Sequence, residues 1–151
     1  MYLEEKIVAD FKEAFKAGDV LRRSVLTMLK STIHNKAIEK KQRDAVMSDE
    51  EVLDIIASEV KRRRDAAGQY RDASRQDLAE KEEAEAVILL AYLPAQLGEA
   101  EIIAAVDAAI AQTGAAGEKD KGKVLGVLSK ELKGKADMAV VSQIVIKKLL
   151  G

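Results

Sequence analysis

Apolar residues recur along most of the chain at intervals of three and four positions, which is the spacing of an amphipathic α-helix. The clearest stripe places Leu21, Val25 and Leu29 at strict steps of four. Neither a hairpin dipeptide nor a run of alternating apolar and polar residues predicts a β-strand. The pattern therefore predicts an all-α protein with seven helices, over about residues 3–17, 19–42, 48–70, 75–91, 99–112, 121–132 and 137–149.

The single proline, Pro94, marks the best place to divide the chain. A residue before proline is disfavoured in α geometry, so Pro94 ends the helix that precedes it. Seven of the nine glycines lie from residue 98 onwards, so the two sides also differ in composition. We predict an N-terminal domain of about four helices, with long helices and hairpins, over residues 1–94. A small, bundle-like C-terminal domain of three helices is predicted over residues 95–151.

The third predicted helix has the most clearly marked start. Ser48 and Glu51 form the pattern of a capping box, in which a hydroxyl and a carboxylate bond to backbone N–H groups at the start of a helix. Beyond Val60 the apolar stripe of this helix thins to alanines and Tyr70. We expect this end to project towards solvent, where residues 62–70 offer a helix face to a partner protein.

The composition excludes several kinds of chemistry. There are no cysteines, which excludes structural disulfides, thiol catalysis and cysteine-bound zinc or iron–sulfur clusters. The single histidine, His34, lies one position from an apolar stripe, and we expect it at or near the surface without a catalytic partner. No spacing of nucleophile, base or metal ligand stands out. We therefore predict no catalytic residue, no metal site and no cofactor.

The balance of charge narrows the choice of partners and location. Lysine and arginine number 25 against 26 aspartates and glutamates, so the net charge of −1 does not attract nucleic acid or membranes by itself. The longest apolar run, residues 86–93, is far shorter than the roughly 20 residues of a membrane span. The first ten residues carry three acids and resemble neither a signal peptide nor a transit peptide. We expect a cytoplasmic protein with no membrane partner, in which any anion site depends on local clustering of basic residues.

Residues 117–123 match the first seven positions of a phosphate-binding P-loop. The next position of a P-loop holds serine or threonine for magnesium, but this chain has Val124 there, and a helical pattern precedes the motif where a strand is needed. Two acids inside the motif, Glu118 and Asp120, would also repel phosphate. We interpret the segment as a connector between helices and not as a nucleotide site.

A dense run of basic residues in the third predicted helix is a candidate contact for RNA phosphates or for a partner protein. An ordinary solvated helix face is the alternative, because Glu59 and Asp65 are spaced to pair with members of the run at four-residue intervals. Only Tyr70 is near enough to supply the aromatic stacking that single-strand binders use. The run consists of Lys61, Arg62, Arg63 and Arg64.

A second basic cluster surrounds the sixth predicted helix and is the main candidate for binding RNA. Exposed amides at helix N-termini there would add to the attraction for phosphate, although a solvated surface is again the alternative. The cluster consists of Lys119, Lys121, Lys123, Lys130, Lys133 and Lys135.

Six segments, taken in order, resemble the YqeY-like family over essentially the whole chain. The Tyr-Leu-Pro-Ala-Gln-Leu sequence at 92–97 is similar to the mid-chain hallmark of that family. The last three segments resemble a C-terminal signature shared with the tail of GatB, a subunit of the glutamine-dependent aminoacyl-tRNA amidotransferase. Leu125 departs from the pattern, in which methionine is frequent at this position, by an apolar exchange only. The segments are residues 22–29, 59–65, 82–97, 113–115, 120–126 and 134–137.

The resemblance implies an all-helical protein associated with carbon–nitrogen ligase chemistry that uses glutamine as amide donor, but not that this chain catalyses it. Because the related tail of the amidotransferase helps to recognise tRNA, the six lysines become candidates for phosphate contacts. Gly122, Gly126 and Gly134 would set backbone turns and close helix packing. We expect an accessory module that binds tRNA or another structured RNA. The alternatives are a helical module that docks on a larger enzyme or ribonucleoprotein and, least supported by the residues, an autonomous enzyme.

Overall fold

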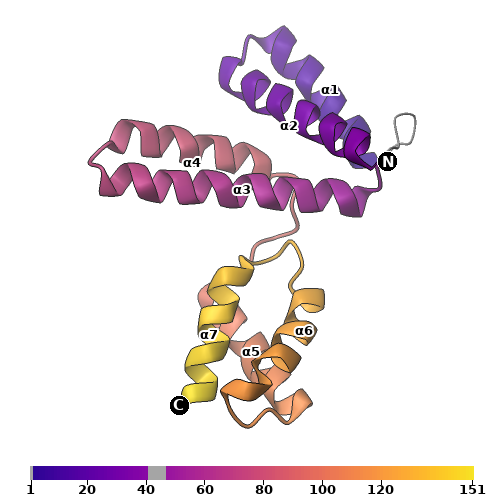
Figure 1. The fold of residues 1–151 in the computed structure, drawn as a ribbon. Coiled ribbons are helices and arrows are strands. Elements are labelled where there is room, and N and C mark those ends of the chain that lie inside the picture. The colour runs from indigo at the N-terminus through magenta and orange to yellow at the C-terminus, as the bar shows by residue number, and fades with distance from the viewer. Residues whose placement is uncertain (1, 41–46) are drawn as a thin grey trace. The chain divides into compact units, whose positions relative to one another are not determined.

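The computed structural model describes residues 2–40 and 47–151, which form helices joined by short connections (Figure 1). No strand occurs in this part of the chain, which confirms the all-α prediction. The chain divides into two compact units, residues 1–93 and 94–151, and each has an apolar core of its own. The assignment of residues 1–94 and 95–151 as separate domains stays a prediction.

The first unit consists of two helix pairs. Its helices are α1 (Tyr2–Ala17), α2 (Val20–Glu39), α3 (Asp49–Asp72) and α4 (Gln76–Leu90). α1 packs beside α2 and α3 packs beside α4, and the apolar stripes of all four helices meet in one core around Ile7, Leu26 and Ile56. The last two residues of the second predicted helix, 41 and 42, lie outside the described residues.

Glycine and polar side chains set the ends of these helices. Gly18 follows α1 with φ +69°, a left-handed conformation that glycine adopts without strain. The carboxylate of Asp19 then accepts a hydrogen bond of 3.1 Å from the N–H of Arg22 at the start of α2. At the start of α3, Ser48 Oγ accepts from the N–H of Glu51 at 3.2 Å, and Glu51 Oε2 accepts from the N–H of Ser48 at 3.0 Å. These two bonds confirm the predicted capping box.

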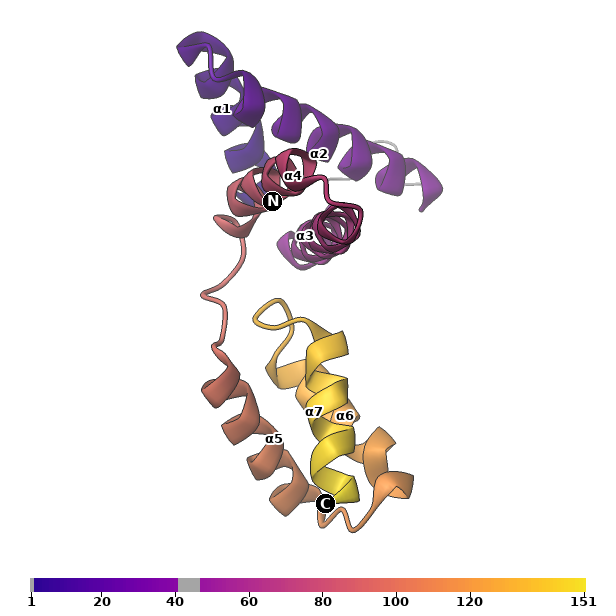
Figure 2. The same cartoon turned by 90° about the vertical axis from the view of Figure 1, so that its left-hand side faces the viewer.

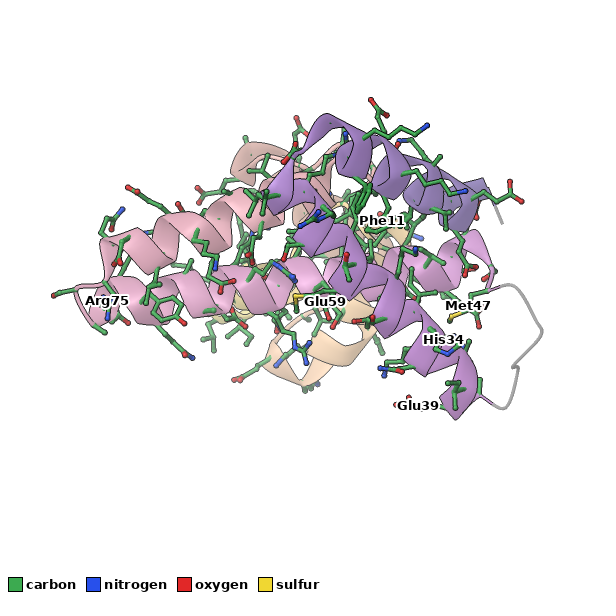
Figure 3. The ribbon with its side chains drawn as sticks, turned by 90° about the horizontal axis from the view of Figure 1, so that it is seen from above. Phe11, His34, Glu39, Met47, Glu59 and Arg75 are labelled. Atoms are coloured by element: carbon green, nitrogen blue, oxygen red, sulfur yellow. The ribbon has the colours of Figure 1, made fainter. Side chains whose placement is uncertain are left out.

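The far half of α3 was expected to project towards solvent, and it does so only together with α4 (Figure 3). α4 runs back along it, and alanines of both helices, including Ala67, Ala79 and Ala86, are almost completely buried. The thin apolar stripe therefore marks a close contact between two helices, since small side chains let helix axes approach. Arg75 lies at the tip of this hairpin, away from α1 and α2 (Figure 3).

The second unit packs three helices and a short 3₁₀ turn around a core formed by Val106, Leu128 and Val141, among others (Figure 2). Gly114, with φ +66°, ends the first of these helices, and the carboxylate of Asp137 caps the last by accepting from the N–H of Ala139 at 2.9 Å. The elements are α5 (Glu99–Thr113), η1 (Glu118–Asp120), α6 (Lys121–Glu131) and α7 (Met138–Leu150).

Candidate nucleic-acid interface

The six lysines of the predicted cluster all lie on α6 or at its two ends. Five of them are exposed, and Lys121 is half-buried at the start of the helix. One lysine belongs to η1, three belong to α6, and two belong to the connection between α6 and α7. In chain order they are Lys119, then Lys121, Lys123 and Lys130, then Lys133 and Lys135.

α6 separates an apolar face from a lysine-bearing face. Val124, Leu128 and Leu132 follow one another at steps of four and are buried in the core of the second unit. Lys123 and Lys130 are seven residues apart, which is about two helical turns, so they lie above one another on the opposite side of the helix. Gly122 and Gly126 follow the same side, and Lys133 lies just beyond the end of the helix, in the turn that follows it. We call this exposed surface the lysine face, and it consists of Gly122, Lys123, Gly126, Lys130 and Lys133.

The two glycines of the lysine face have no packing role inside the molecule. A Cβ atom added at Gly122 or at Gly126 would meet nothing within 4 Å, so the expectation that they allow close helix packing is wrong. Gly134 differs, because its φ of +73° confirms the expected role in a backbone turn. The lysine face therefore contains two glycines that the fold itself does not require.

Carboxylates near the lysine face are largely engaged by backbone groups. Asp120 Oδ2 accepts from the N–H of Ala116 at 3.0 Å, and this bond, ahead of the nearby lysines, lowers the pKa of Asp120. Asp120 also lies 3.7 Å from Lys123 Nζ, but that lysine side chain stays 69% exposed. Asp137 is occupied as the cap of α7. Residues 119–137 carry six lysines against three acids, Asp120, Glu131 and Asp137, so the formal charge of this segment is positive although the whole chain is close to neutral.

Residues 94–97 hold the α6–α7 connection, which carries Lys133 and Lys135, in place. The sequence did not predict these residues as part of the site. The N–H of Leu97 donates to the carbonyl of Lys135 at 2.9 Å, and Gln96 Nε2 donates to the carbonyl of Gly134 at 2.7 Å. Pro94 Cδ lies 3.6 Å from the position that a Cβ of Gly134 would take. Gln96 and Leu97 are therefore positioning residues for the end of α6. The signal that could have paired these segments is that both carry the family resemblance.

Tyr92, which lies just before this segment, is held within the first unit by contacts with α1. The hydroxyl of Tyr92 donates to Asp10 Oδ2 at 2.6 Å, and Lys6 Nζ lies 5.0 Å from the centre of the Tyr92 ring. Burial of the hydroxyl and its bond to Asp10 raise the pKa of Tyr92. Burial opposes ionisation of Asp10, but the hydrogen bonds from Tyr92 and Lys6 outweigh it and lower the pKa of Asp10.

The basic run of α3 is not a single surface. Arg63 is only 6% exposed, and its guanidinium lies between Glu59 Oε2, at 2.8 Å, and Glu85 Oε2 of α4, at 3.3 Å. This confirms the predicted pair of Glu59 and Arg63 and makes it part of the α3–α4 contact. Arg62 also contacts Glu59, at 3.0 Å, while its side chain stays largely exposed. The remaining two members, Lys61 and Arg64, are exposed.

Two other features of the sequence were checked against the structure. Residues 117–123 follow α5 and not a strand, which agrees with their interpretation as a connector. Within the described ranges, no three His, Asp or Glu side chains are grouped so that they could hold a metal ion. No helix in those ranges is both long and apolar enough to cross a membrane.

Comparison with known proteins gives one family and two relatives. The model of the family described as Yqey-like protein matches residues 4–149, nearly the whole chain. A protein of Kluyveromyces lactis named altered inheritance of mitochondria protein 41, mitochondrial, is 39% identical over 84 residues, which are 55% of this chain. Its namesake in Vanderwaltozyma polyspora is 33% identical over 84 residues, or 56% of this chain. The matched stretch spans 44% of the length of each relative, so less than half of either protein is represented here.

Proposed function

The chain belongs to the YqeY-like family, and we propose that it is an accessory module that binds tRNA or another structured RNA. The observation that carries the proposal is the lysine face of α6. This face places exposed lysines along one side of α6 and in the turn after it, while the other side of the helix is packed into the core. In this proposal any carbon–nitrogen ligase chemistry belongs to a partner enzyme, and the chain itself supplies no catalytic residue.

The lysine face suits a phosphate backbone for two physical reasons. Lys123 and Lys130 are separated by seven residues, which is about 10 Å along a helix, so both can neutralise phosphates of one RNA strand or of two strands across a groove. Gly122 and Gly126 carry no side chain, and nothing lies within 4 Å of the place of a Cβ at either, so a phosphate or a ribose can approach the backbone there closely. Structured RNA is recognised largely by shape and by its backbone, so aromatic stacking is not required.

The test is a titration of fluorescently labelled bulk tRNA with the full chain at about 50 and about 200 mM salt. If three phosphates are neutralised, the affinity should fall by roughly 40-fold between the two salt concentrations. A variant with Lys123, Lys130 and Lys133 all changed to alanine should bind at least about tenfold more weakly at low salt. It should also lose most of the salt dependence.

The matched control removes three exposed lysines elsewhere, Lys36, Lys81 and Lys147, so that the net charge changes by the same amount. It should bind tRNA almost as well as the unchanged chain. An equal loss of tRNA affinity in both triple variants would show that only the net charge matters, and it would refute the lysine face as the binding surface. An absence of tRNA binding at about 50 mM salt would refute direct recognition by this chain. A further variant, Lys61→Ala with Arg64→Ala, tests whether the exposed residues of the α3 run contribute.

A further inference from the structure

Two hollows lie along the α1–α2 pair in the first unit, far along the chain from the lysine face. The larger, of about 410 Å³, is lined from α1 by Glu4 and Val8 and from α2 by Lys30 and His34, among others. The smaller, of about 270 Å³, is lined by Phe11, Lys12, Phe15 and Lys16. Figure 3 labels Phe11 and His34, one residue from each hollow.

The two hollows belong to one surface. Glu4, Val8, Phe11 and Phe15 recur along α1 at steps of four, three and four, so they form a single stripe on that helix. Lys30 of α2 lines the larger hollow, and its Nζ lies 4.2 Å from the centre of the Phe11 ring, which lines the smaller hollow; the smaller hollow itself is lined by α1 alone. We call this surface the α1–α2 groove. The stripe from Glu4 to Phe15 spans about 16 Å, or three helical turns.

The floor of the groove carries more apolar surface than a solvated helix needs. Phe11 and Phe15 are the only phenylalanines of the chain, and their ring centres are 6.4 Å apart. Phe11 is half-buried, whereas Phe15 is 60% exposed. An exposed aromatic side chain beside a hollow is typical of the residues that dominate protein–protein binding.

The charges around the groove define what it fits. Lys12 and Lys16 line the phenylalanine hollow, and the guanidinium of Arg23 lies 5.5 Å from the centre of the Phe15 ring. Glu4, at the other end, has a buried Oε2 that accepts no hydrogen bond. That oxygen has no exposed surface, so an occupant meets Glu4 as a partly exposed acidic side chain that lines the hollow. The groove therefore favours an occupant that is acidic where it meets Lys12, Lys16 and Arg23 and basic at the Glu4 end.

We propose that the α1–α2 groove docks an acidic amphipathic helix of a partner protein. Apolar side chains of that helix, spaced over two to three turns, rest on Phe11 and Phe15. Its acidic residues face Lys12, Lys16 and Arg23, and a lysine or arginine near one end donates to Glu4. An RNA strand fits less well, because its phosphates would meet the acidic side chain of Glu4. The proposal uses the first unit only and does not depend on RNA binding by α6.

The test places the photo-crosslinking residue p-benzoylphenylalanine at position 15 of the full chain expressed in cells, and sequences the crosslinked segment by mass spectrometry. The same residue at position 87 serves as the control, because Val87 is similarly exposed, at 64%, on α4 of the same unit. The expected product is a protein segment with apolar residues at helical spacing and flanking acids. Crosslinking to RNA, crosslinking to a segment without that pattern, or no excess over position 87 would each overturn the proposal.

The identified segment, made as a labelled peptide, is then titrated with the full chain. Phe15→Ala should weaken binding by at least about tenfold, which corresponds to 1.4 kcal/mol. Lys12→Glu combined with Lys16→Glu should weaken it further, and Glu4→Gln should weaken it unless the basic residue of the peptide is also replaced. Val87→Ala should leave peptide binding unchanged, and Phe15→Ala should leave tRNA binding unchanged. Peptide binding that is indifferent to Phe15→Ala would refute the groove as the docking site.

Discussion

Replacing Gly126 by alanine should stabilise the second unit and weaken RNA binding in the same variant. Gly126 lies in the interior of α6, and a Cβ at this position meets nothing within 4 Å. Glycine in a helix interior is about 1 kcal/mol less favourable than alanine, because more backbone freedom is lost on folding. In a unit of this size such a gain raises the melting temperature by about 4–8 °C. Gly122 lies in the first turn of α6, so its replacement should gain less.

The RNA-binding part of this prediction follows from the place of Gly126 between Lys123 and Lys130. An added methyl group would stand between the helix backbone and the RNA, and we expect roughly threefold to tenfold weaker binding of tRNA at about 50 mM salt. Stability is measured by calorimetry and affinity by the titration described above. Stabilisation with weakened binding is an unusual combination, since loss of binding through misfolding would change both in the same direction.

Gly68 provides the matched control. It lies inside α3, it also has nothing within 4 Å of an added Cβ, and it is remote from the lysine face in the sequence. Gly68→Ala should therefore stabilise by a similar amount and leave tRNA affinity unchanged. Gly134→Ala should instead destabilise by about 1 kcal/mol or more, because φ is +73° there. If Gly126→Ala destabilises the protein, the open environment of this helix position is refuted; if tRNA affinity stays the same, the glycines have no part in the contact.

Two further predictions concern the first unit. Arg63→Met should destabilise the protein by about 3 kcal/mol in urea denaturation, because it leaves the buried carboxylate of Glu59 without its main partner. Adding Glu59→Leu should restore much of the lost stability. An Arg63→Met variant as stable as the unchanged chain would contradict this prediction. Tyr92→Phe should cost about 1–2 kcal/mol at pH 7 by removing the bond to Asp10. Because folding lowers the pKa of Asp10, this contribution to stability is complete above about pH 4 and is lost as the pH falls through the folded-state pKa of Asp10. The difference in stability between Tyr92→Phe and the unchanged chain should therefore shrink by about pH 3. A difference that stays constant with pH would show that Asp10 is not the group involved.

The helices were predictable because their signals are local. Apolar residues at steps of three and four, Gly18 after α1 and the box of Ser48 and Glu51 each act within one or two turns of chain. The pairing of α3 with α4 was not predictable in this way. Its alanines give a weak apolar signal, and the contact of Arg63 with Glu85 joins residues 22 positions apart. An alanine-rich helix face that packs against another helix has the same sequence pattern as one that is exposed to solvent.

The candidate site was predictable as a set of lysines but not as a surface. Helical spacing separates Lys123 and Lys130 from the apolar positions of α6. The bond from Leu97 to Lys135 joins segments 38 residues apart, and no periodicity reports such a distant pairing. The burial of Arg63 inside the other basic run was equally hidden, because the same spacing to Glu59 fits a solvated pair and a buried one.

Two segments that resemble the family, residues 82–97 and 134–137, contact each other, and this contact shows which of their residues serve the fold. Leu97 and Gly134 are used by the fold, the first through its bond to the α6–α7 connection and the second through its positive φ. A chain with this architecture needs a backbone N–H at position 97 and a glycine at position 134 whether or not it binds RNA. Gly122 and Gly126 are different, because alanine would fit at both positions and would make the helix more stable. Glycines that the fold does not need, flanked by exposed lysines, are therefore better support for a binding surface than any other residues of the resemblance.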